Sequence, residues 1–283
     1  MMNTQSLQAK TVLVTGCSSG IGRSIAVHLQ NRGWTVFPTA RSEHDVEQLL
    51  SKGFQALPLD LRDSASIQQC TASIAAACPF GLGALVNNAG IAIPGAVEDL
   101  SRENLRQQFE VNVFGLQELT NQIIPTFRHQ GWGRIVHISS IYGVLTAPMV
   151  GGYCASKYAL EALANAQRME LKGSGVAVSL IEPGAIRFNL RSSAMKHLQR
   201  KLSSADHFHS AYIETLKEQT TSQNYREQHM QPPETVAYKV QHALTSQHPR
   251  RRYFVTREAR LGAIASRALP GFLLDRLMQS ITP

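Results

Sequence analysis

The sequence predicts an α/β fold in which helices cover both faces of a doubly wound parallel sheet of about seven strands. Short aliphatic and β-branched runs alternate with longer segments of helical periodicity along the 283 residues. The strand candidates are continuous apolar runs, which is typical of strands buried on both faces of a parallel sheet. Hydrophobic residues make up 43% and charged residues 17%, so the composition is that of a globular protein.

Each element can be placed from its pattern. Gly33 and Gly53 follow the first two helical segments, and Gly131 or Gly133 and then Gly173 or Gly175 follow the two longest ones, where glycine is suited to end a helix. The predicted helices include 21–32, a polar segment ending at Gly53, 102–130 and 153–172. The predicted strands are 11–15, 34–39, 54–59, 84–87, 134–139, 176–181 and 252–256.

We expect one domain over residues 1–283, with a substrate-side insertion at 188–231. This insertion is polar, rich in Ser, Gln and His, and lacks a strand candidate. We interpret it as a mostly helical lid over the substrate, the alternative being a solvated helical pair without a role.

The net charge of +8 is unevenly distributed. Residues 1–186 hold 13 basic and 13 acidic side chains, so the whole excess lies in 187–283. No nucleic-acid-binding motif accompanies this charge, and we expect no nucleic-acid partner. The four cysteines form no CxxC pair, which predicts reduced thiols in a cytoplasmic protein and no metal site.

A glycine-rich turn lies between the first strand and the first helix, with the sequence Thr-Gly-Cys-Ser-Ser-Gly-Ile-Gly from Thr15 to Gly22. Its glycines allow a pyrophosphate to approach the backbone, and the helix that follows presents free N–H groups. Leu59-Asp60-Leu61 and Asn87-Asn88-Ala89-Gly90 end the next strands of that half, where side chains can reach a bound dinucleotide.

The residue type after the second strand bears on the choice of cofactor. An acidic residue there would bind a ribose 2′-hydroxyl, but this chain has Arg41, and its first carboxylate is Glu43. The guanidinium of Arg41 could pair with a 2′-phosphate, and Ser19 could add a hydroxyl donor. We therefore favour NADP(H); the alternative is a surface arginine with Glu43 bent back to the ribose.

Tyr153 and Lys157 share one face at the start of a helix. A free tyrosine has a pKa of about 10, and a nearby ammonium favours the phenolate, so we expect Lys157 to lower the pKa of Tyr153. Ser140 ends the fifth strand and could hydrogen-bond a substrate oxygen. Asn112 lies in a long helical pattern, where its amide either satisfies a local backbone group or positions a water. Pro183-Gly184 follows the sixth strand and would form a wall beside a nicotinamide.

The set TGCSSGIG, NNAG, VNVFG, ISS, YCASK and EPG resembles the short-chain dehydrogenase/reductase family over most of residues 11–187. It is most similar to the branch with 17β-hydroxysteroid dehydrogenases, retinol dehydrogenases and bacterial NADP-dependent aldehyde reductases. The resemblance implies a Rossmann-like fold, an NADP(H) cofactor and a homodimer or homotetramer.

The resemblance also implies roles for single residues. Tyr153 would be the general acid/base, Lys157 would lower its pKa and hold the ribose, Ser140 would orient the carbonyl, and Asn112 would hold a water. The family's threonine after the PG pair is absent, and Asn189 could replace it. The positions that match cofactor contacts are Gly16, Ser18, Ser19, Gly20, Ile21, Gly22, Arg41, Asp60, Leu61, Asn88, Ala89, Gly90, Tyr153, Lys157, Pro183, Gly184 and Ile186.

These residues predict an oxidoreductase that interconverts a lipophilic aldehyde or ketone and its alcohol, of the aldehyde, steroid or retinoid type. The alternatives are an epimerase or dehydratase on the same fold, or a non-enzymatic NADP-binding protein.

No run approaches the roughly 20 apolar residues of a spanning helix. The segment 261–281 combines apolar residues with arginines, and its apolar face could lie on a membrane surface or cover the core or a subunit interface.

Overall fold

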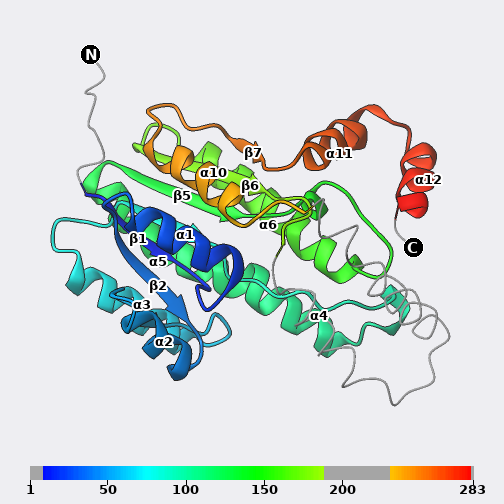
Figure 1. Ribbon diagram of the computed structural model, residues 1–283. Coiled ribbons are helices and arrows are strands. Elements are labelled where there is room, and N and C mark those ends of the chain that lie inside the picture. The colour runs from blue at the N-terminus through cyan, green and yellow to red at the C-terminus, as the bar shows by residue number, and fades with distance from the viewer. Residues whose placement is uncertain (1–8, 188–229, 282–283) are drawn as a thin grey trace.

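The structure, a computed structural model, describes residues 9–187 and 230–281, in which seven parallel strands form one sheet (Figure 1). The order is β3-β2-β1-β4-β5-β6-β7, so the chain starts at the centre, winds to one edge and returns to wind to the other. This is the predicted doubly wound sheet. Its strands are β1 (Thr11–Val14), β2 (Thr35–Ala40), β3 (Leu57–Pro58), β4 (Ala84–Asn87), β5 (Gly133–Ile138), β6 (Val176–Glu182) and β7 (Arg252–Phe254).

Helices cover both faces of the sheet, as the alternation predicted. In β1, Val12 and Val14 pack on one face, whereas Leu13 packs on the other. The first face is covered by α1 (Gly20–Gln30), α2 (Glu43–Leu50) and α10 (Glu234–Thr245), and the second by α3 (Ser64–Ala77), α5 (Leu116–Gln130) and α6 (Gly151–Glu170). Both layers bury aliphatic side chains on strands that show little exposed surface, which explains why the strand candidates are apolar throughout.

Some predicted boundaries are wrong. The predicted strand 54–59 shortens to Leu57–Pro58, because it lies at the sheet edge and Pro58 has no N–H to donate. The predicted helix 102–130 is three successive segments, namely α4 (Arg102–Phe109), a π-helical turn (Glu110–Gly115) and α5. Strand β7 ends before Thr256, whose side chain caps α11 (Arg257–Ala268) by accepting from the N–H of Ala259 at 3.1 Å.

The ends of the 188–231 insertion lie side by side. Ile186 pairs with Gln231 in a parallel bridge, and the N–H of Arg187 donates to the Gln231 carbonyl at 2.9 Å. The insertion therefore leaves and re-enters the fold at one place, beyond the end of β6. The predicted lid itself, with Asn189, lies outside the described residues.

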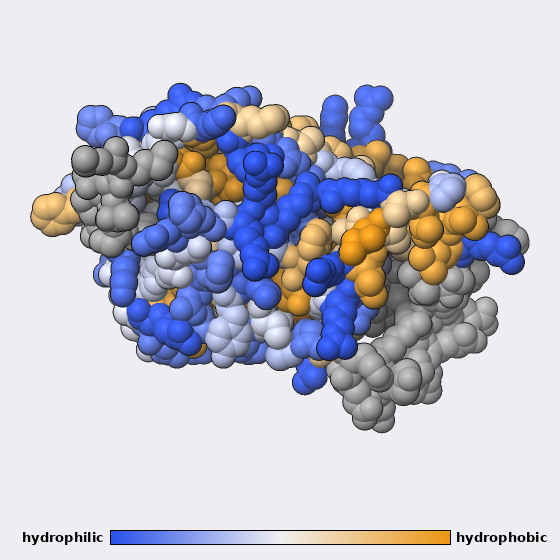
Figure 2. Space-filling model, turned by 90° about the horizontal axis from the view of Figure 1, so that it is seen from above, coloured by the Kyte–Doolittle hydropathy of each residue, from blue (hydrophilic) through white to orange (hydrophobic). Residues whose placement is uncertain are grey.

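The C-terminal segment forms α11 and α12 (Gly271–Ile281). Met278 and Leu274 pack on Leu145 and Ala147 in the loop after β5, so one side of the segment covers the core. The other side exposes hydrophobic side chains, which gather at the end of the molecule in Figure 2; they include Leu261, Ile264, Phe272, Leu273 and Leu277. Within the described ranges, no helix combines the length and the apolar character needed to cross a bilayer.

Candidate active site

The predicted site residues meet at the carboxyl ends of the strands, on both sides of the point where the strand order reverses between β1 and β4. In open α/β sheets this switch point forms the ligand-binding crevice. The glycine loop follows β1, Asn88 to Gly90 follow β4, Ser140 follows β5, and Pro183 follows β6. Gly16 and Pro183, which lie 167 positions apart in the sequence (183 − 16), are thereby brought to the same edge of the sheet.

Four hydrogen bonds connect the end of β1 and the glycine loop to the loop after β4. The Thr15 hydroxyl accepts the backbone N–H groups of Asn88 and Ala89, each at 2.9 Å, and the Asn88 amide donates to the Thr15 and Gly16 carbonyls at 2.8 and 3.0 Å. Gly16 has a φ of +70°, and a Cβ there would lie 2.8 Å from the Ala89 Cα. A Cβ on Gly22 would overlap the Gly16 carbonyl oxygen. Both positions thus require glycine.

The start of α1 is suited to an anion. Its N-cap residue Ser19 makes no side-chain cap hydrogen bond, and its first turn holds no acidic residue. The first N–H groups of a helix lack intrahelical partners and carry the positive end of the dipole. Together with the tight loop between Gly16 and Gly22, this end of α1 fits the pyrophosphate of a dinucleotide cofactor.

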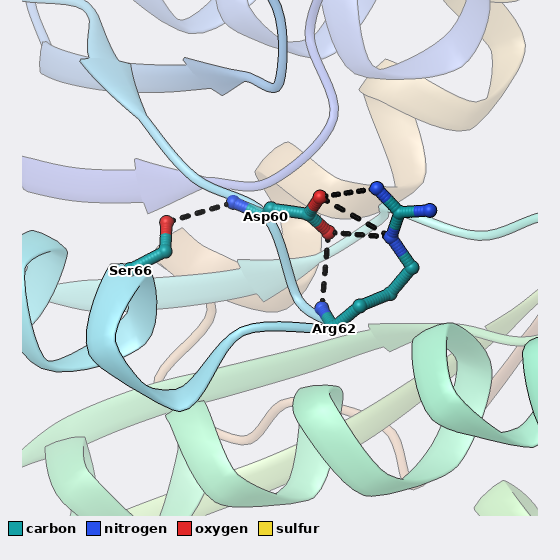
Figure 3. Close-up of polar contacts among 3 residues, drawn as sticks. All are labelled: Asp60, Arg62 and Ser66. Atoms are coloured by element: carbon teal, nitrogen blue, oxygen red, sulfur yellow. Dashed lines mark hydrogen bonds and ion pairs between the residues drawn. The ribbon is translucent and has the colours of Figure 1, made fainter.

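Two arginines act on Asp60, which lies just beyond the end of β3. Arg62 binds Asp60 through a fork, with Nη2 2.5 Å from Oδ2 and Nε 2.9 Å from Oδ1 (Figure 3). Hydrogen bonding from Arg62 lowers the pKa of Asp60, and the charge of Arg41 adds to this effect. Arg41 is exposed directly after β2, whereas Glu43 is exposed in the first turn of α2. Sequence reasoning missed Arg62, although it stands two residues after Asp60.

Helix α6 brings Tyr153 and Lys157 to the end of β5. The Lys157 ammonium donates to the Ile138 carbonyl at 2.9 Å and lies 5.7 Å from the centroid of the Tyr153 ring. Ser140 shares a side-chain hydrogen bond with Tyr153, and its Oγ accepts the N–H of Tyr142 at 3.2 Å. The predicted group of Ser140, Tyr153 and Lys157 is therefore assembled.

The expected decrease of the Tyr153 pKa is not what the structure gives. Burial raises the pKa of Tyr153 to about 12, and the hydrogen bond with Ser140 only partly opposes this increase. Burial also lowers the pKa of Lys157 to about 8. The prediction considered the charge of Lys157 and neglected the desolvation of both groups, which is the larger effect here.

Asn112 lies in the π-helical turn and is completely buried. Its Oδ1 accepts the N–H of Ile91 at 2.9 Å, and its Nδ2 donates to the Ile91 carbonyl at 2.9 Å and to Ser156 Oγ at 3.0 Å. A Cβ on Gly90 would lie 3.3 Å from Asn112 Oδ1 and 3.8 Å from Lys157 Nζ. Asn112 therefore satisfies backbone groups, one of the two roles considered, and holds the loop that carries Gly90 beside Lys157.

A second amide supports the same loop and was missed from the sequence. Gln108 Oε1 accepts the N–H of Ile93 at 2.8 Å, and its Nε2 donates to the Ile91 carbonyl at 2.6 Å. Gln108 precedes Asn112 by four residues, so the two amides share one helix face, and this spacing could have identified Gln108 from the sequence.

The PG turn closes the site on the other side. The Pro183 carbonyl accepts the N–H of Ile141 at 2.9 Å, which ties the turn to the loop that carries Ser140. A Cβ on Gly184 would overlap Thr256 Oγ1, so this position also requires glycine. Ile186 is buried and begins the bridge to Gln231.

Comparisons with known proteins agree with this arrangement. A family model described as short chain dehydrogenase matches residues 10–199. The chain is 37% identical to YbbO, an uncharacterized oxidoreductase of Escherichia coli (strain K12), over 98% of this chain and 96% of that protein. It is 33% identical to retinol dehydrogenase 7 of Rattus norvegicus, over 96% and 88% of the two chains.

Two further matches bear on cofactor and fold. The NADPH-dependent 3-dehydrocapnine reductase of Ornithobacterium rhinotracheale is 33% identical, over 94% of each chain. Among solved structures, a short-chain dehydrogenase from Streptomyces avermitilis has a TM-score of 0.77 and 29% identity, over 98% of this chain and 96% of that chain.

Proposed function

Because this chain belongs to the short-chain dehydrogenase family, we propose that it is an NADP(H)-dependent oxidoreductase that interconverts an aldehyde or ketone and the corresponding alcohol. The observation that carries the proposal is the placement of Ser140, Tyr153 and Lys157 next to a glycine loop at the switch point of the sheet. Hydride transfer at a carbon and proton transfer at the attached oxygen require a cofactor-binding loop and a proton-donating group side by side.

The side chains have distinct tasks in carbonyl reduction. When bound in this site, NADPH would supply the hydride for the carbonyl carbon. The Tyr153 hydroxyl donates its proton to the carbonyl oxygen, and the Ser140 hydroxyl donates a hydrogen bond to the same oxygen. The pKa of about 12 keeps Tyr153 protonated at neutral pH, which is the form that reduction needs. Alcohol oxidation needs the phenolate, so this direction depends on the positive charge of Lys157.

Three observations favour NADP(H) over NAD(H). Arg41 stands at the end of β2, where NAD-dependent proteins carry a carboxylate. Arg62 adds a second cation next to Asp60. The similar 3-dehydrocapnine reductase is NADPH-dependent. Arg41→Asp should therefore raise the KM for NADPH far more than the KM for NADH, whereas an equal effect on both would refute recognition of a 2′-phosphate.

We further propose a lipophilic substrate. Ile141 and Tyr142, in the turn that follows Ser140, are hydrophobic side chains that are only partly buried, and the Tyr142 ring meets the Tyr153 ring edge-on at 6.3 Å. The similarity to a retinol dehydrogenase supports the same class. Turnover of long-chain aldehydes, retinoids and steroids with NADPH, compared with small polar carbonyl compounds, tests this choice. We propose a cytoplasmic location because the four cysteines are free thiols.

The decisive variant is Tyr153→Phe, with Tyr158→Phe as its control. Tyr158 lies on the same helix but is 42% exposed. Tyr153→Phe should retain NADPH binding and lose at least a hundredfold in turnover, a typical contribution of a positioned acid/base group. Tyr158→Phe should keep its turnover. Unchanged turnover in Tyr153→Phe would contradict the assignment, and turnover without net oxidation of NADPH would favour an epimerase or dehydratase.

A further inference from the structure

A buried ion network lies behind Lys157 and plays no part in the reaction described so far. Arg252 of β7 binds two carboxylates, with its Nη1 2.7 Å from Glu161 Oε2 and also paired with Glu182 Oε1. The Glu161 and Glu182 side chains are 6% and 0% exposed, and Arg252 is 21% exposed. The network joins α6, the end of β6 and β7. Burying three charged groups is costly, so the arrangement calls for an explanation beyond packing.

Glu161 is the member closest to the site. It follows Lys157 by four residues on α6, so both side chains share one face of the helix. A Cβ on Gly143 would lie 2.9 Å from Glu161 Cγ and 2.8 Å from Ser139 Oγ, which places Glu161 against the strand end and loop that carry Ser140. Burial lowers the pKa of Lys157, and the charge of Glu161 partly opposes this decrease. Burial likewise raises the pKa of Glu161, and the charges of Arg252 and Lys157 partly oppose that increase.

Burial raises the pKa of both carboxyls, that of Glu182 to about 7, so Arg252 is shared between two carboxylates only while Glu182 is ionised. Of the two, Glu161 is the carboxyl on the same helix face as Lys157. His137 also lies near Lys157, but burial lowers its pKa to about 4, so it is neutral at physiological pH. Arg267 on α11 acts on Glu182 from the exposed side. Burial lowers the pKa of Lys157 to about 8, and Glu161 supplies the negative charge that opposes this loss of the ammonium form.

We propose that Glu161, held in place by Arg252, is a positioning residue whose negative charge keeps Lys157 protonated and thereby sets the pH range in which Tyr153 reacts. Glu161 acts through Lys157, without contact to the substrate. Glu182 is the second carboxylate that Arg252 binds, so Arg252 is not paired with Glu161 alone. The effect on Lys157 is independent of the proposed function, and only the effect on Tyr153 depends on it.

The charge of Lys157 can be measured directly in the full-length chain. We suggest ¹³Cε-labelled lysine spectra as a function of pH, with Lys157 assigned by comparison with Lys157→Met. In Glu161→Gln the Lys157 midpoint should fall by about one unit or more, because an opposite charge at close range shifts a pKa by roughly one to three units. Glu161→Asp should restore part of the shift. Glu170→Gln, on the exposed end of the same helix, should leave it unchanged.

The outcomes separate the proposal from the proposed function. An unchanged Lys157 midpoint in Glu161→Gln overturns the proposal, whatever the activity. If that variant does not fold, Glu182→Gln takes its place and should shift the midpoint in the same direction. With turnover as the readout, the apparent pKa for alcohol oxidation should rise by about one unit in Glu161→Gln and stay constant in Glu170→Gln. A merely structural role would lower the rate equally at all pH values and would also overturn the proposal.

Discussion

Removal of Arg252 should destabilise the protein strongly and in a pH-dependent way. The guanidinium lies between the Glu161 and Glu182 carboxylates, both of which are almost completely buried. Arg252→Met keeps the length of the side chain and leaves two uncompensated negative charges. Breaking a buried ion pair on one side costs about 3–5 kcal/mol. For a chain of this size, about 1 kcal/mol corresponds to roughly 2–4 °C in Tm, so we expect a loss of about 6–20 °C at neutral pH.

The loss should diminish as the pH falls. Burial and the neighbouring Glu161 charge already raise the pKa of Glu182 to about 7 in the presence of Arg252. Without Arg252, both carboxyls have folded-state pKa values above their unfolded values. The folded state then binds more protons than the unfolded state, so stability increases as the pH falls through this window. The difference in Tm between Arg252→Met and the unaltered chain should thus be larger at pH 7.5 than at pH 5.5.

Thermal denaturation of Arg252→Met and Arg251→Met at both pH values tests this reasoning. Arg251 is the exposed neighbour on the same strand end, and its replacement should cost no more than about 0.5 kcal/mol. Equal Tm values for the two variants, or a deficit in Arg252→Met that does not change with pH, would refute the view that Arg252 balances buried charge.

Three further predictions follow from single contacts. Gly22→Ala should abolish the stabilisation that NADPH confers in a thermal-shift assay, because the new Cβ would overlap the Gly16 carbonyl oxygen. The control is Gly33→Ala, whose Cβ would meet open space. It should cost only about 1 kcal/mol of folding stability and should retain the stabilisation by NADPH. Asn112→Ala should leave the Ile91 N–H and carbonyl without their side-chain partner, at a cost of about 1–3 kcal/mol in folding stability. It should also lower kcat more than it weakens NADPH binding. A larger effect on NADPH binding than on kcat would contradict the role of Asn112 in holding the loop beside Lys157. Leu261, Ile264 and Phe272 are exposed near arginines, so the chain should co-sediment with anionic vesicles more than with neutral ones. Phe272→Gln should weaken this effect, whereas Phe80→Gln, at a still more exposed phenylalanine outside this segment, should not. Sedimentation that is independent of lipid charge would argue against it.

The sequence was most informative where a single local rule decides the structure. Strand β4 has its predicted bounds, Ala84–Asn87, because an apolar run between turn residues has few alternatives in a parallel sheet. Gly131 ends α5 with a φ of +74°, as a C-terminal glycine should. The helices over 64–77 and 234–245 were not predicted, since the first is rich in Ser, Ala and Gln and has only three buried residues to mark its inner face.

The candidate site could be predicted in its membership but less well in its electrostatics. Strand ends and the YxxxK spacing bring Ser140, Tyr153 and Lys157 together, and both features are visible in the sequence. The sign of the Tyr153 pKa shift depends on how completely the tertiary structure excludes water from the ring, which no local pattern records. Arg252 is likewise about 90 residues from Glu161 in the sequence, so their pairing requires the register of β6 and β7.

Helix α6 connects the two parts of this electrostatic system. Tyr153, Lys157 and Glu161 are spaced by four residues, so one rigid stripe carries the proton donor, the cation that acts on it and the anion that acts on the cation. The anion is fixed by Arg252, which is the first residue of β7 and pairs with Leu180 of β6. On this proposal the reactivity of Tyr153 depends on the last strand of the sheet, although no residue of β7 is among the candidate site residues. A change that shifts the register of β7 should alter the pH dependence of the reaction before it alters the binding of NADPH.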